Sequence, residues 1–438
     1  MESISKDIQK HLIFAWRNAI EASKDLKKAT SMPHTFHASP EGSFFLTLEG
    51  INAVRQIILD SKKVPDVASK FSDEYLERII MASIAKLLSC VEEKICLEAQ
   101  KQAEEILRVL ASPAVEWTLI VPIVNLELEM DELQIGKVRL HRFKTDEEKE
   151  LYEKITKIYR KLQQKSSVLP KDIPEGLITD LQETVKKNFI GRVCAEVTTQ
   201  AVDSKRAEDI GMQLLHLVLD TLCFYRFNRN FRDVLFAKNR FDIQGNLLQD
   251  TQSLILFAET EISFPKKLTG FVAPFTITMS ALRDIRTDGF DVVSDILKKD
   301  EQNWTEFEKD LITSIRFIAI SAQDEQIANA FVNSVISLEA LLLDEHESII
   351  DNLAERIAFI IGKNASERNQ YFDEMRRLYK IRCNVVHSGN TDIKYSDLSL
   401  LRRFINYRCV VNLLNSYRSL KISSIKDLIK WIRDQKFS

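Results

Sequence analysis

Apolar residues recur every three or four positions along most of this chain, which is the spacing of amphipathic helices. In residues 1–112 a first helical stripe ends before residues 33–42, whose proline and glycine favour a loop. A second stripe, which includes Val91, predicts one long helix over residues 73–112, because Pro113 disfavours helical geometry in the residue before it. These stripes predict an N-terminal helical region that packs into a core or binds a partner helix.

The periodicity changes in residues 113–302. Apolar and polar residues alternate within residues 117–143, which is the pattern of half-buried strands, and the polar pair at residues 131–132 suggests the turn of a hairpin. Residues 191–202 have the composition of another strand, and an amphipathic helix is predicted over residues 205–225. Two further strand candidates follow at residues 254–264 and 271–278. This middle region is predicted to be an α+β domain with a small sheet backed by helices.

Helical spacing returns in residues 303–438. No proline follows Pro274, and only three glycines follow it, so few residues would break a helix here. Thr305 and Glu308 form a capping-box pattern ahead of an apolar run. Five helices are predicted, beginning near residues 305, 327, 348, 364 and 395. The expected fold class is mainly α: an N-terminal helical region, a small α+β domain and a C-terminal all-α bundle.

Composition narrows the classes of function. The six cysteines have no CxxC spacing, so neither a zinc site nor a disulfide framework is indicated, and we expect no metal and no cofactor. Glycine-rich phosphate-binding loops and the GxSxG nucleophile elbow are both missing from the sequence. The N-terminus has no apolar targeting segment, and no apolar run reaches the length of a membrane span. These features predict a cytoplasmic protein without a membrane partner.

Charge is divided unevenly within the predicted bundle. Residues 304–374 contain five Lys or Arg against fourteen Asp or Glu, whereas residues 375–438 contain fourteen against four. The acidic helices can complement the basic ones inside the bundle or across a dimer, or the basic half can present a face to a polyanion. The asymmetry alone does not decide between these interpretations.

The most distinctive segment is LYKIRCNVVHSGN, residues 378–390. It carries Arg382 and, after four intervening residues, His387. Two blocks precede it, SLEALLL at residues 337–343 and LAERIAFIIG at residues 353–362. The order and spacing of the three blocks resemble the Apea-like branch of the HEPN domains, many of which are metal-independent ribonucleases with an Arg-x4-6-His element late in a helical bundle.

This resemblance covers residues 304 to about 420 and implies a metal-independent endoribonuclease that acts as a toxin or antiphage defence effector. It implies that Arg382, His387 and Asn384 are the catalytic residues. It also implies a homodimer through the C-terminal domain, since related domains pair with their motifs facing each other. Basic residues in and after the motif are the candidate RNA contacts: Arg376, Arg377, Lys380, Arg402, Arg403 and Arg408.

The residue types suit this chemistry. RNA carries its own nucleophile, the 2′-OH, next to the phosphorus that it attacks, so the substrate itself supplies proximity. An imidazole can move protons at neutral pH, and a guanidinium can stabilise charge on the phosphate oxygens. The expected products therefore carry 2′,3′-cyclic phosphate ends, and the reaction needs no metal.

Helix geometry limits how the motif can work. Five residues at 100° each place Arg382 and His387 about 140° apart on a regular helix. Either the helix unwinds at His387, or the site combines residues of two chains, and the resemblance favours the second solution. In the alternative without a catalytic site, His387 caps the helix end and Arg382 pairs with a buried structural acid such as Glu339, which lies among leucines.

Two other functions compete with the ribonuclease. One is a non-catalytic module for RNA binding or protein assembly that kept the fold and lost the activity. The other is a mainly structural protein whose N-terminal helices bind an additional protein partner. The predicted charge and helix patterns are compatible with all three functions.

Overall fold

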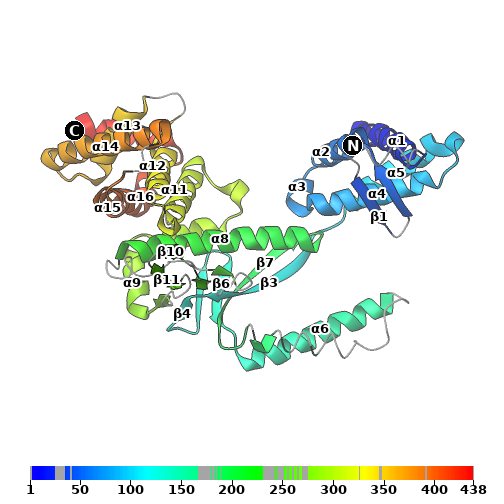
Figure 1. Cartoon of the computed structure of the whole chain (residues 1–438), viewed down its shortest axis with the longest axis horizontal. Helices are drawn as coiled ribbons and strands as arrows, with labels where there is room; N and C mark the ends of the chain where they lie inside the picture. The colour runs from blue at the N-terminus through cyan, green and yellow to red at the C-terminus, as the bar shows by residue number, and fades with distance from the viewer. Residues whose placement is uncertain are drawn as a thin grey trace. The chain divides into compact units, whose positions relative to one another are not determined.

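The computed structural model describes most of the chain and is mainly helical, which confirms the predicted fold class (Figure 1). The described residues are 2–24, 35–39, 42–165, 179, 183, 185–187, 189–229, 242–243, 251–253, 256–258, 261–263, 266–268, 275–324, 326–344, 348–389 and 392–437. They form two compact units: residues 1–119 with 198–212, and residues 120–197 with 213–438. The three sequence regions stay a prediction about domains.

The N-terminal unit is a helical bundle with one hairpin. Its elements are α1 (Glu2–Lys24), β1 (Thr35–Ser39), β2 (Gly42–Leu46), α2 (Leu48–Ser61), α3 (Val67–Lys70), α4 (Asp73–Leu88), η1 (Glu92–Lys94) and α5 (Ile95–Leu110). Ile8, Leu12 and Ala15 on α1 are fully buried against α4 and α5, which explains the first apolar stripe. Asp203 belongs to the same unit and fixes the start of α4. Its carboxylate accepts hydrogen bonds from the backbone N–H and the hydroxyl of Ser72, which precedes α4.

Two predictions for this unit were wrong. The single helix over residues 73–112 is two helices, α4 and α5, because the chain turns at Ser89 and enters η1. Val91, which the stripe placed in the core, is 67% exposed in that turn. The segment expected to be a loop contains the antiparallel pair β1–β2, with residues 35 to 39 paired to residues 46 to 42. Proline and glycine in this segment favoured a loop, but they do not show whether the residues around them pair as strands.

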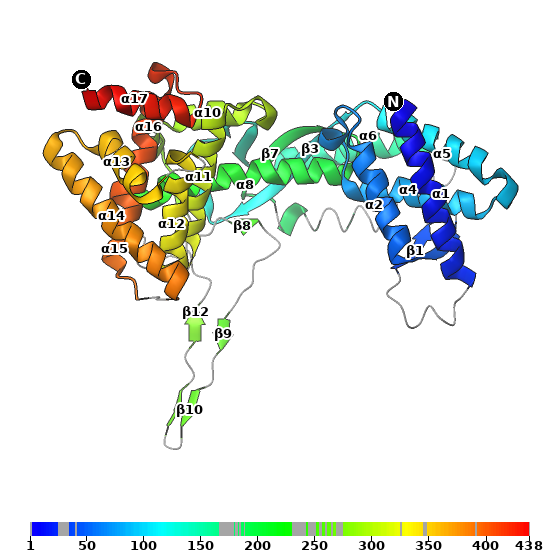
Figure 2. The same cartoon turned by 90° about the horizontal axis from the view of Figure 1, so that it is seen from above.

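A five-stranded sheet in the order β5-β6-β7-β3-β8 follows along the chain. Its strands and the adjacent elements are β3 (Val115–Val124), β4 (Leu126–Leu128), β5 (Glu132–Ile135), β6 (Val138–Arg142), α6 (Thr145–Lys165), β7 (Val193–Ala201), α8 (Ser204–Arg229) and β8 (Asp242–Ile243). The strand and the helix predicted near residues 191–225 are therefore present as β7 and α8. In Figures 1 and 2 the long helix α8 lies along the sheet.

The hairpin turn does not lie where the polar residues suggested. Glu132 belongs to β5, and the turn is at Gly136 and Lys137, because Ile135 pairs with Val138. Gly136 has a φ of +58°, a backbone conformation that glycine adopts without a steric penalty. The polar pair at residues 131–132 only marks the start of the strand.

Short strand pairs follow the sheet. They are β9 (Thr251–Ser253) with β12 (Lys266–Leu268), β10 (Leu256–Ala258) with β11 (Glu261–Ser263), and β13 (Phe275–Ile277) parallel to β4. Within the candidate strand at residues 254–264, residues 256–258 pair with residues 261–263, and residues 254–255, 259–260 and 264 lie outside the described residues. Of the candidate at residues 271–278, residues 271–274 lie outside the described residues.

The rest of the second unit is helical; it contains the five helices that the sequence predicted, and also helices within residues 279–298 and 425–437 that it did not predict. Its helices are α9 (Met279–Thr287), α10 (Phe290–Lys298), η3 (Glu301–Asn303), α11 (Glu306–Gln323), α12 (Ile327–Leu342), α13 (Ile349–Ile361), α14 (Ala365–Ser388), α15 (Tyr395–Ser399), the π-helix η4 (Leu400–Asn406), α16 (Tyr407–Leu420) and α17 (Ile425–Phe437). The capping box of Thr305 and Glu308 is present at the start of α11. Asn364 caps α14 by accepting a hydrogen bond from the N–H of Glu367 at 3.0 Å.

Buried serines bring α11 and α12 close together. The hydroxyls of Ser314 and Ser337 lie 2.9 Å apart, and those of Ser321 and Ser334 lie 2.6 Å apart. Asn406, in the π-helix, donates a hydrogen bond to the carbonyl of Ser334 at 2.7 Å. Because each of the four hydroxyls and the side-chain N–H of Asn406 has a partner, the core tolerates them, and they fix how η4 lies on the α11–α12 pair.

Gly289 is a position in this bundle where a side chain would meet a severe steric conflict. It has a φ of +86°, and a Cβ atom built there would lie 2.5 Å from the Cβ of Leu414 on α16. Gly389 also has a positive φ, +65°, but a Cβ atom added to it would meet no heavy atom within 4 Å among the described residues. A side chain at Gly389 would therefore add backbone strain alone, whereas a side chain at Gly289 would add both backbone strain and a steric clash.

We expect Gly289→Ala to lower the free energy of unfolding by about 1–3 kcal/mol more than Gly389→Ala does, because α10 and α16 must move apart. Gly389→Ala should cost only about 1 kcal/mol, the penalty for a left-handed residue with a side chain. Urea unfolding followed by circular dichroism measures both. Equal losses would contradict the close packing of α10 on α16.

Candidate functional site at the end of α14

The motif helix α14 is regular to its last residue. It runs from Ala365 to Ser388 and ends where Gly389 adopts a left-handed conformation and donates its N–H to the carbonyl of Val385. His387 therefore lies inside the last turn and not in unwound chain. The predicted option in which the helix breaks at His387 is wrong, because the residue that permits the turn is Gly389, two positions later.

Arg382 faces the interior of the bundle. Its Nη2 lies 3.3 Å from Oε1 of Glu339 on α12, and both side chains are about one-fifth exposed. Tyr379, one turn earlier on α14, donates its hydroxyl to the same carboxylate at 2.8 Å. The expected pairing of Arg382 with Glu339 is present, although Glu339 is only partly buried. The sequence analysis did not predict the contribution of Tyr379. Its position three residues before Arg382, on the same face of the helix, was the signal that could have indicated it.

This contact holds the three side chains in one arrangement. Burial and the hydrogen bond to Glu339 raise the pKa of Tyr379, so the phenol stays protonated and acts as a donor. The guanidinium of Arg382 lies over the ring of Tyr379, 5.6 Å from its centroid. Its Nε is buried without a hydrogen-bond partner among the described residues. Arg382 is thus oriented by α12 and by its own helix before any ligand binds.

His387 lies on the other side of α14. Lys380, Asn384 and His387 follow one another at intervals of four and three residues, so they share one face of the helix. All three are exposed, and Cys383 between them is half-buried. Within one chain the structure therefore groups His387 with Asn384 and Lys380, and it does not bring His387 to Arg382.

Three of the predicted RNA contacts are exposed arginines that also make contacts within the bundle. The Nε of Arg376 lies 3.0 Å from Oδ1 of Asp351. Arg377 binds Glu374 at 2.6 Å and Asp397 at 2.7 Å, and these hydrogen bonds raise its pKa. The remaining exposed arginine of this set, Arg408, donates to the hydroxyl of Tyr371 at 3.0 Å. A phosphate group would have to compete with these partners.

Arg402 is placed unlike the other predicted RNA contacts. Its Nε donates to the hydroxyl of Ser321 at 2.8 Å, and its Nη2 bonds to the carbonyl of the same residue. Burial lowers the pKa of Arg402 to about 10. The guanidinium is bound to the end of α11, so a phosphate group would have to displace Ser321, and the assignment of Arg402 to RNA binding stays a prediction. Its neighbour Arg403 is half-buried on η4.

The charge asymmetry is partly resolved inside the bundle. Arg376 reaches Asp351, Arg382 reaches Glu339, and Lys436 on α17 forms an ion pair with Glu355 on α13. Each pair joins the basic half of the bundle to the acidic half. Intramolecular complementarity, one of the interpretations of the sequence, therefore accounts for part of the basic excess.

A separate titratable cluster lies on the sheet. The Nδ1 of His141 is 3.2 Å from Glu147, and its Nε2 is 3.4 Å from Glu196. Arg139 forms an ion pair with Glu196 at 3.0 Å and neutralises part of this charge. The sequence did not single out this cluster, because the pairing of β6 with β7 and the position of the first turn of α6, which carries Glu147, bring its members together. Among the described residues, no group of three or more His, Cys, Asp or Glu side chains, this cluster included, could hold a metal ion.

Comparisons with known proteins add no assignment. No family model matches the chain, and neither a curated protein nor a solved structure matches it. Over the part of the chain that the structure describes, no helix combines the length and the apolar character needed to cross a membrane. The interpretation of the site therefore rests on its own geometry.

The contact of Glu339 predicts a structural role that can be measured. We expect Glu339→Ala to lower the free energy of unfolding by about 1–3 kcal/mol, because it leaves Arg382 and the hydroxyl of Tyr379 without their acceptor. Asp373→Ala, which removes an exposed acid from the same bundle, should change stability by less than about 0.5 kcal/mol. Thermal and urea unfolding compare the two variants. A Glu339→Ala protein of unchanged stability that lost function would make Glu339 part of the functional machinery instead.

Proposed function

We propose that the chain is a metal-independent endoribonuclease whose site lies at the end of α14. The observation that carries this proposal is the exposed group of His387, Asn384 and Lys380 on one face of that helix, within the block that resembles the HEPN motif. A solvent-exposed imidazole next to an amide and a cation can reach a phosphodiester and exchange protons with it. The substrate class is RNA, because the 2′-OH supplies the nucleophile.

Each residue has a defined part in this proposal. His387 accepts the proton of the 2′-OH or delivers one to the leaving 5′ oxygen. Arg382, oriented by Glu339 and Tyr379, stabilises negative charge on the phosphate oxygens. Asn384 hydrogen-bonds the substrate beside His387. Lys380 and the exposed arginines Arg376, Arg377 and Arg408, together with Arg403, hold the RNA backbone, and Arg402 would have to release Ser321 to join them.

A homodimer through the C-terminal unit completes the proposed site. The divergence of about 140° keeps Arg382 and His387 of one chain apart, since α14 is regular. Two chains related by a two-fold axis can instead place Arg382 of one protomer beside His387 of its partner. Val386, which lies between these residues, is 49% exposed, and Phe404 on η4 is 46% exposed. Apolar side chains of this kind suit a protein interface.

The biological role rests on the resemblance alone. A metal-independent ribonuclease of this type would act in the cytoplasm on cellular or phage RNA, as a toxin or antiphage defence effector. Such an enzyme needs no cofactor.

A specific observation favours a second candidate function, a non-catalytic module for RNA binding or protein assembly. Arg382 already has an acidic partner in Glu339, and its Nε is buried. If the ion pair persists when RNA is present, the arginine serves the fold and the exposed face of α14 serves only binding. Cleavage assays separate the two functions.

The first test is cleavage of RNA in the presence of EDTA. We expect the purified full chain to produce 2′,3′-cyclic phosphate and 5′-OH ends and to leave DNA intact. His387→Ala should reduce the rate at least about 100-fold, the usual contribution of a general acid or base. Mass spectrometry of the RNA ends and denaturing gels provide the measurements.

His216→Ala is the matched control for that substitution, because His216 is also exposed on a helix of this unit but lies on α8. It should retain the full rate. Loss of cleavage in EDTA, or equal cleavage of DNA, would refute the 2′-OH mechanism. RNA binding without cleavage would favour the non-catalytic module.

The second test asks whether two chains share one site. Arg382→Ala and His387→Ala should each be inactive, and a mixture of the two should recover activity, because a mixed dimer contains one cleft with both groups intact. Equal mixing should restore up to about a quarter of the wild-type rate, since half of the dimers are mixed and each has one intact cleft of two. Native mass spectrometry verifies that mixed dimers form. Mixed dimers without activity would show that the motif does not work across the interface.

A further inference from the structure

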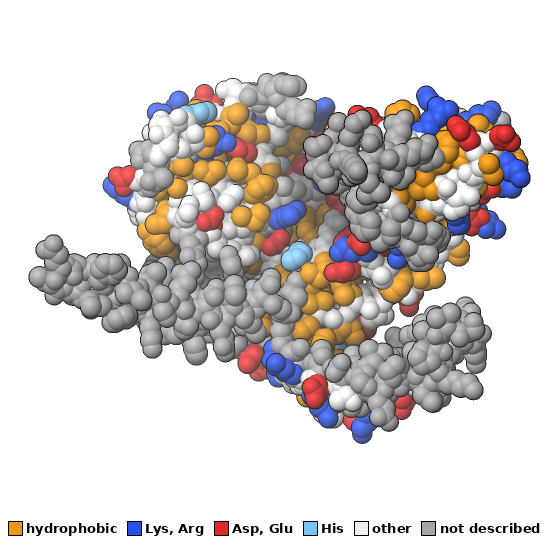
Figure 3. Space-filling view, turned by 45° about the vertical axis from the view of Figure 1, so that its right-hand side comes forward, with side chains coloured by type: hydrophobic (Ala, Val, Ile, Leu, Met, Phe, Trp, Pro, Cys, Tyr) orange, Lys and Arg blue, Asp and Glu red, His pale blue; other side chains and the backbone are white. Residues whose placement is uncertain are grey.

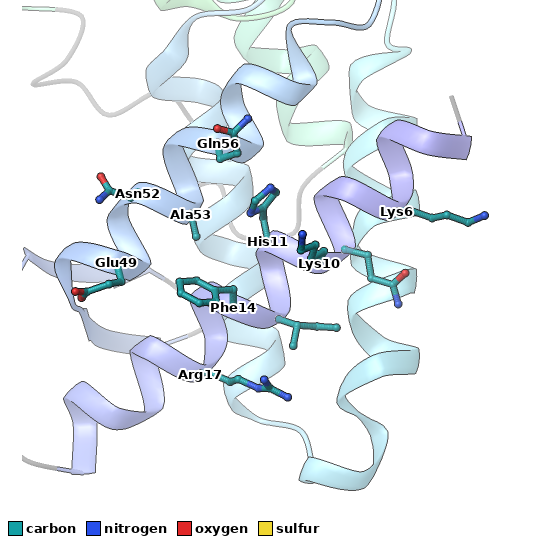
Figure 4. Close-up of a pocket in the computed structure, with 11 residues that line it drawn as sticks. Lys6, Lys10, His11, Phe14, Arg17, Glu49, Asn52, Ala53 and Gln56 are labelled. Carbon is teal, nitrogen blue, oxygen red and sulfur yellow. The ribbon is translucent and has the colours of Figure 1, made fainter.

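A groove between α1 and α2 is a candidate binding surface that the ribonuclease proposal does not use. It has a volume of about 820 Å³ and is lined by residues of these two helices (Figure 4). Both helices belong to the N-terminal unit, and their other faces bury the core residues Leu12 and Ile57. The groove is therefore a feature of the outer surface of a packed bundle.

The residues that α1 contributes lie along one stripe. Lys6, Lys10, Phe14 and Arg17 are separated by four, four and three residues, which places them on one side of the helix. At about 1.5 Å per residue, this stripe is roughly 16 Å long, which equals about three turns of a helix. The apolar periodicity of α1 does not reveal this stripe, because three of its four residues are charged and Phe14 is the single apolar one.

The groove combines an apolar centre with a basic edge. Phe14 is 47% exposed, although it is a large aromatic residue in a well-packed unit. In Figure 4 Phe14 and His11 extend from α1 towards α2, where Ala53 lies. Lys6, Lys10 and Arg17 supply positive charge along α1.

The opposite edge, on α2, is mainly neutral. It carries the amides of Asn52 and Gln56 and one carboxylate, Glu49, which is the single acidic residue among the described residues that line the groove. Figure 3 shows orange and blue side chains next to one another on the N-terminal unit, at the right of the view. An apolar centre beside a row of cations is complementary to a ligand that is apolar on one side and acidic along the other.

We propose that this groove binds an acidic amphipathic helix of a partner protein. A groove between two helices accepts a third helix through apolar side chains at intervals of three and four residues, and the length of the stripe matches about three turns. The apolar side of the partner helix covers Phe14 and Ala53, and its acidic residues reach Lys10 and Arg17. This proposal is independent of the ribonuclease activity.

Two other occupants fit less well. A second copy of the same groove would bring Lys6, Lys10 and Arg17 of both chains together, which like charges disfavour. Single-stranded nucleic acid is usually held by several aromatic platforms along a basic groove. Among the described residues that line this groove, Phe14 is the only Phe, Tyr or Trp, and the carboxylate of Glu49 would repel the phosphate groups.

Selection from a random library of 15-residue peptides displayed on phage, with the full chain as bait, tests the proposal. We expect the enriched peptides to carry net negative charge and apolar residues at helical spacing. The affinity of the best synthetic peptide, measured by fluorescence anisotropy, should fall at least about tenfold with Phe14→Ala and with Arg17→Glu. Circular dichroism of the bound peptide should show helix.

The N-terminal unit offers matched control variants outside the groove. Leu97→Ala removes a 59% exposed apolar residue of α5, and Lys94→Glu reverses an exposed cation of η1. Both should leave the affinity unchanged. Enrichment of basic peptides, or binding that survives Phe14→Ala, would overturn the proposal. A dimer that dissociates in sedimentation when Phe14 is replaced by alanine would also overturn it. So would a 15-nucleotide RNA that binds the groove in place of a peptide and loses affinity with Phe14→Ala.

Discussion

The regularity of α14 is the constraint on which the arrangement of the candidate site depends. Because the helix continues without a break to Ser388, each side chain on it has a fixed direction relative to the bundle. Arg382 and Tyr379 must therefore face α12, and His387 must face solvent. The proposed pairing of Arg382 with a histidine of a second chain follows from this geometry.

The acceptor on α12 shows how the bundle orients the arginine. One carboxylate, Glu339, receives both the hydroxyl of Tyr379 and the guanidinium of Arg382. A partly buried arginine without such an acceptor would turn towards water, and its direction would be lost. The same contact that stabilises the fold thus preorganises a cation near the surface, so the structural and the catalytic interpretations of Arg382 are compatible.

The two units use helices differently. In the C-terminal bundle, buried serines and Asn406 allow close contact between helices, and ion pairs join its acidic half to its basic half. In the N-terminal unit, α1 buries Ile8 and Leu12 and leaves Phe14 exposed in a groove beside cations. The first arrangement pairs most of these polar groups within the bundle, whereas the second leaves an apolar side chain uncovered, and an uncovered aromatic residue suits a binding surface.

Local signals in the sequence determined the helical class of the fold, the start of α11 at Thr305 and the end of α14 at Gly389. These features depend on periodicity and on capping groups within a few residues of one another. The tertiary structure alone decided the strand pairing of β1 with β2, the division of residues 73–112 into two helices, and the burial of Arg402 against Ser321. Ser321, the partner of Arg402, lies on another helix 81 residues away. The pairing of β1 with β2 and the turn after α4 involve neighbouring residues, and packing against α1 and α4 favours them over a loop and a continuous helix. Spacing places residues on a face of a helix, and only packing determines what that face meets.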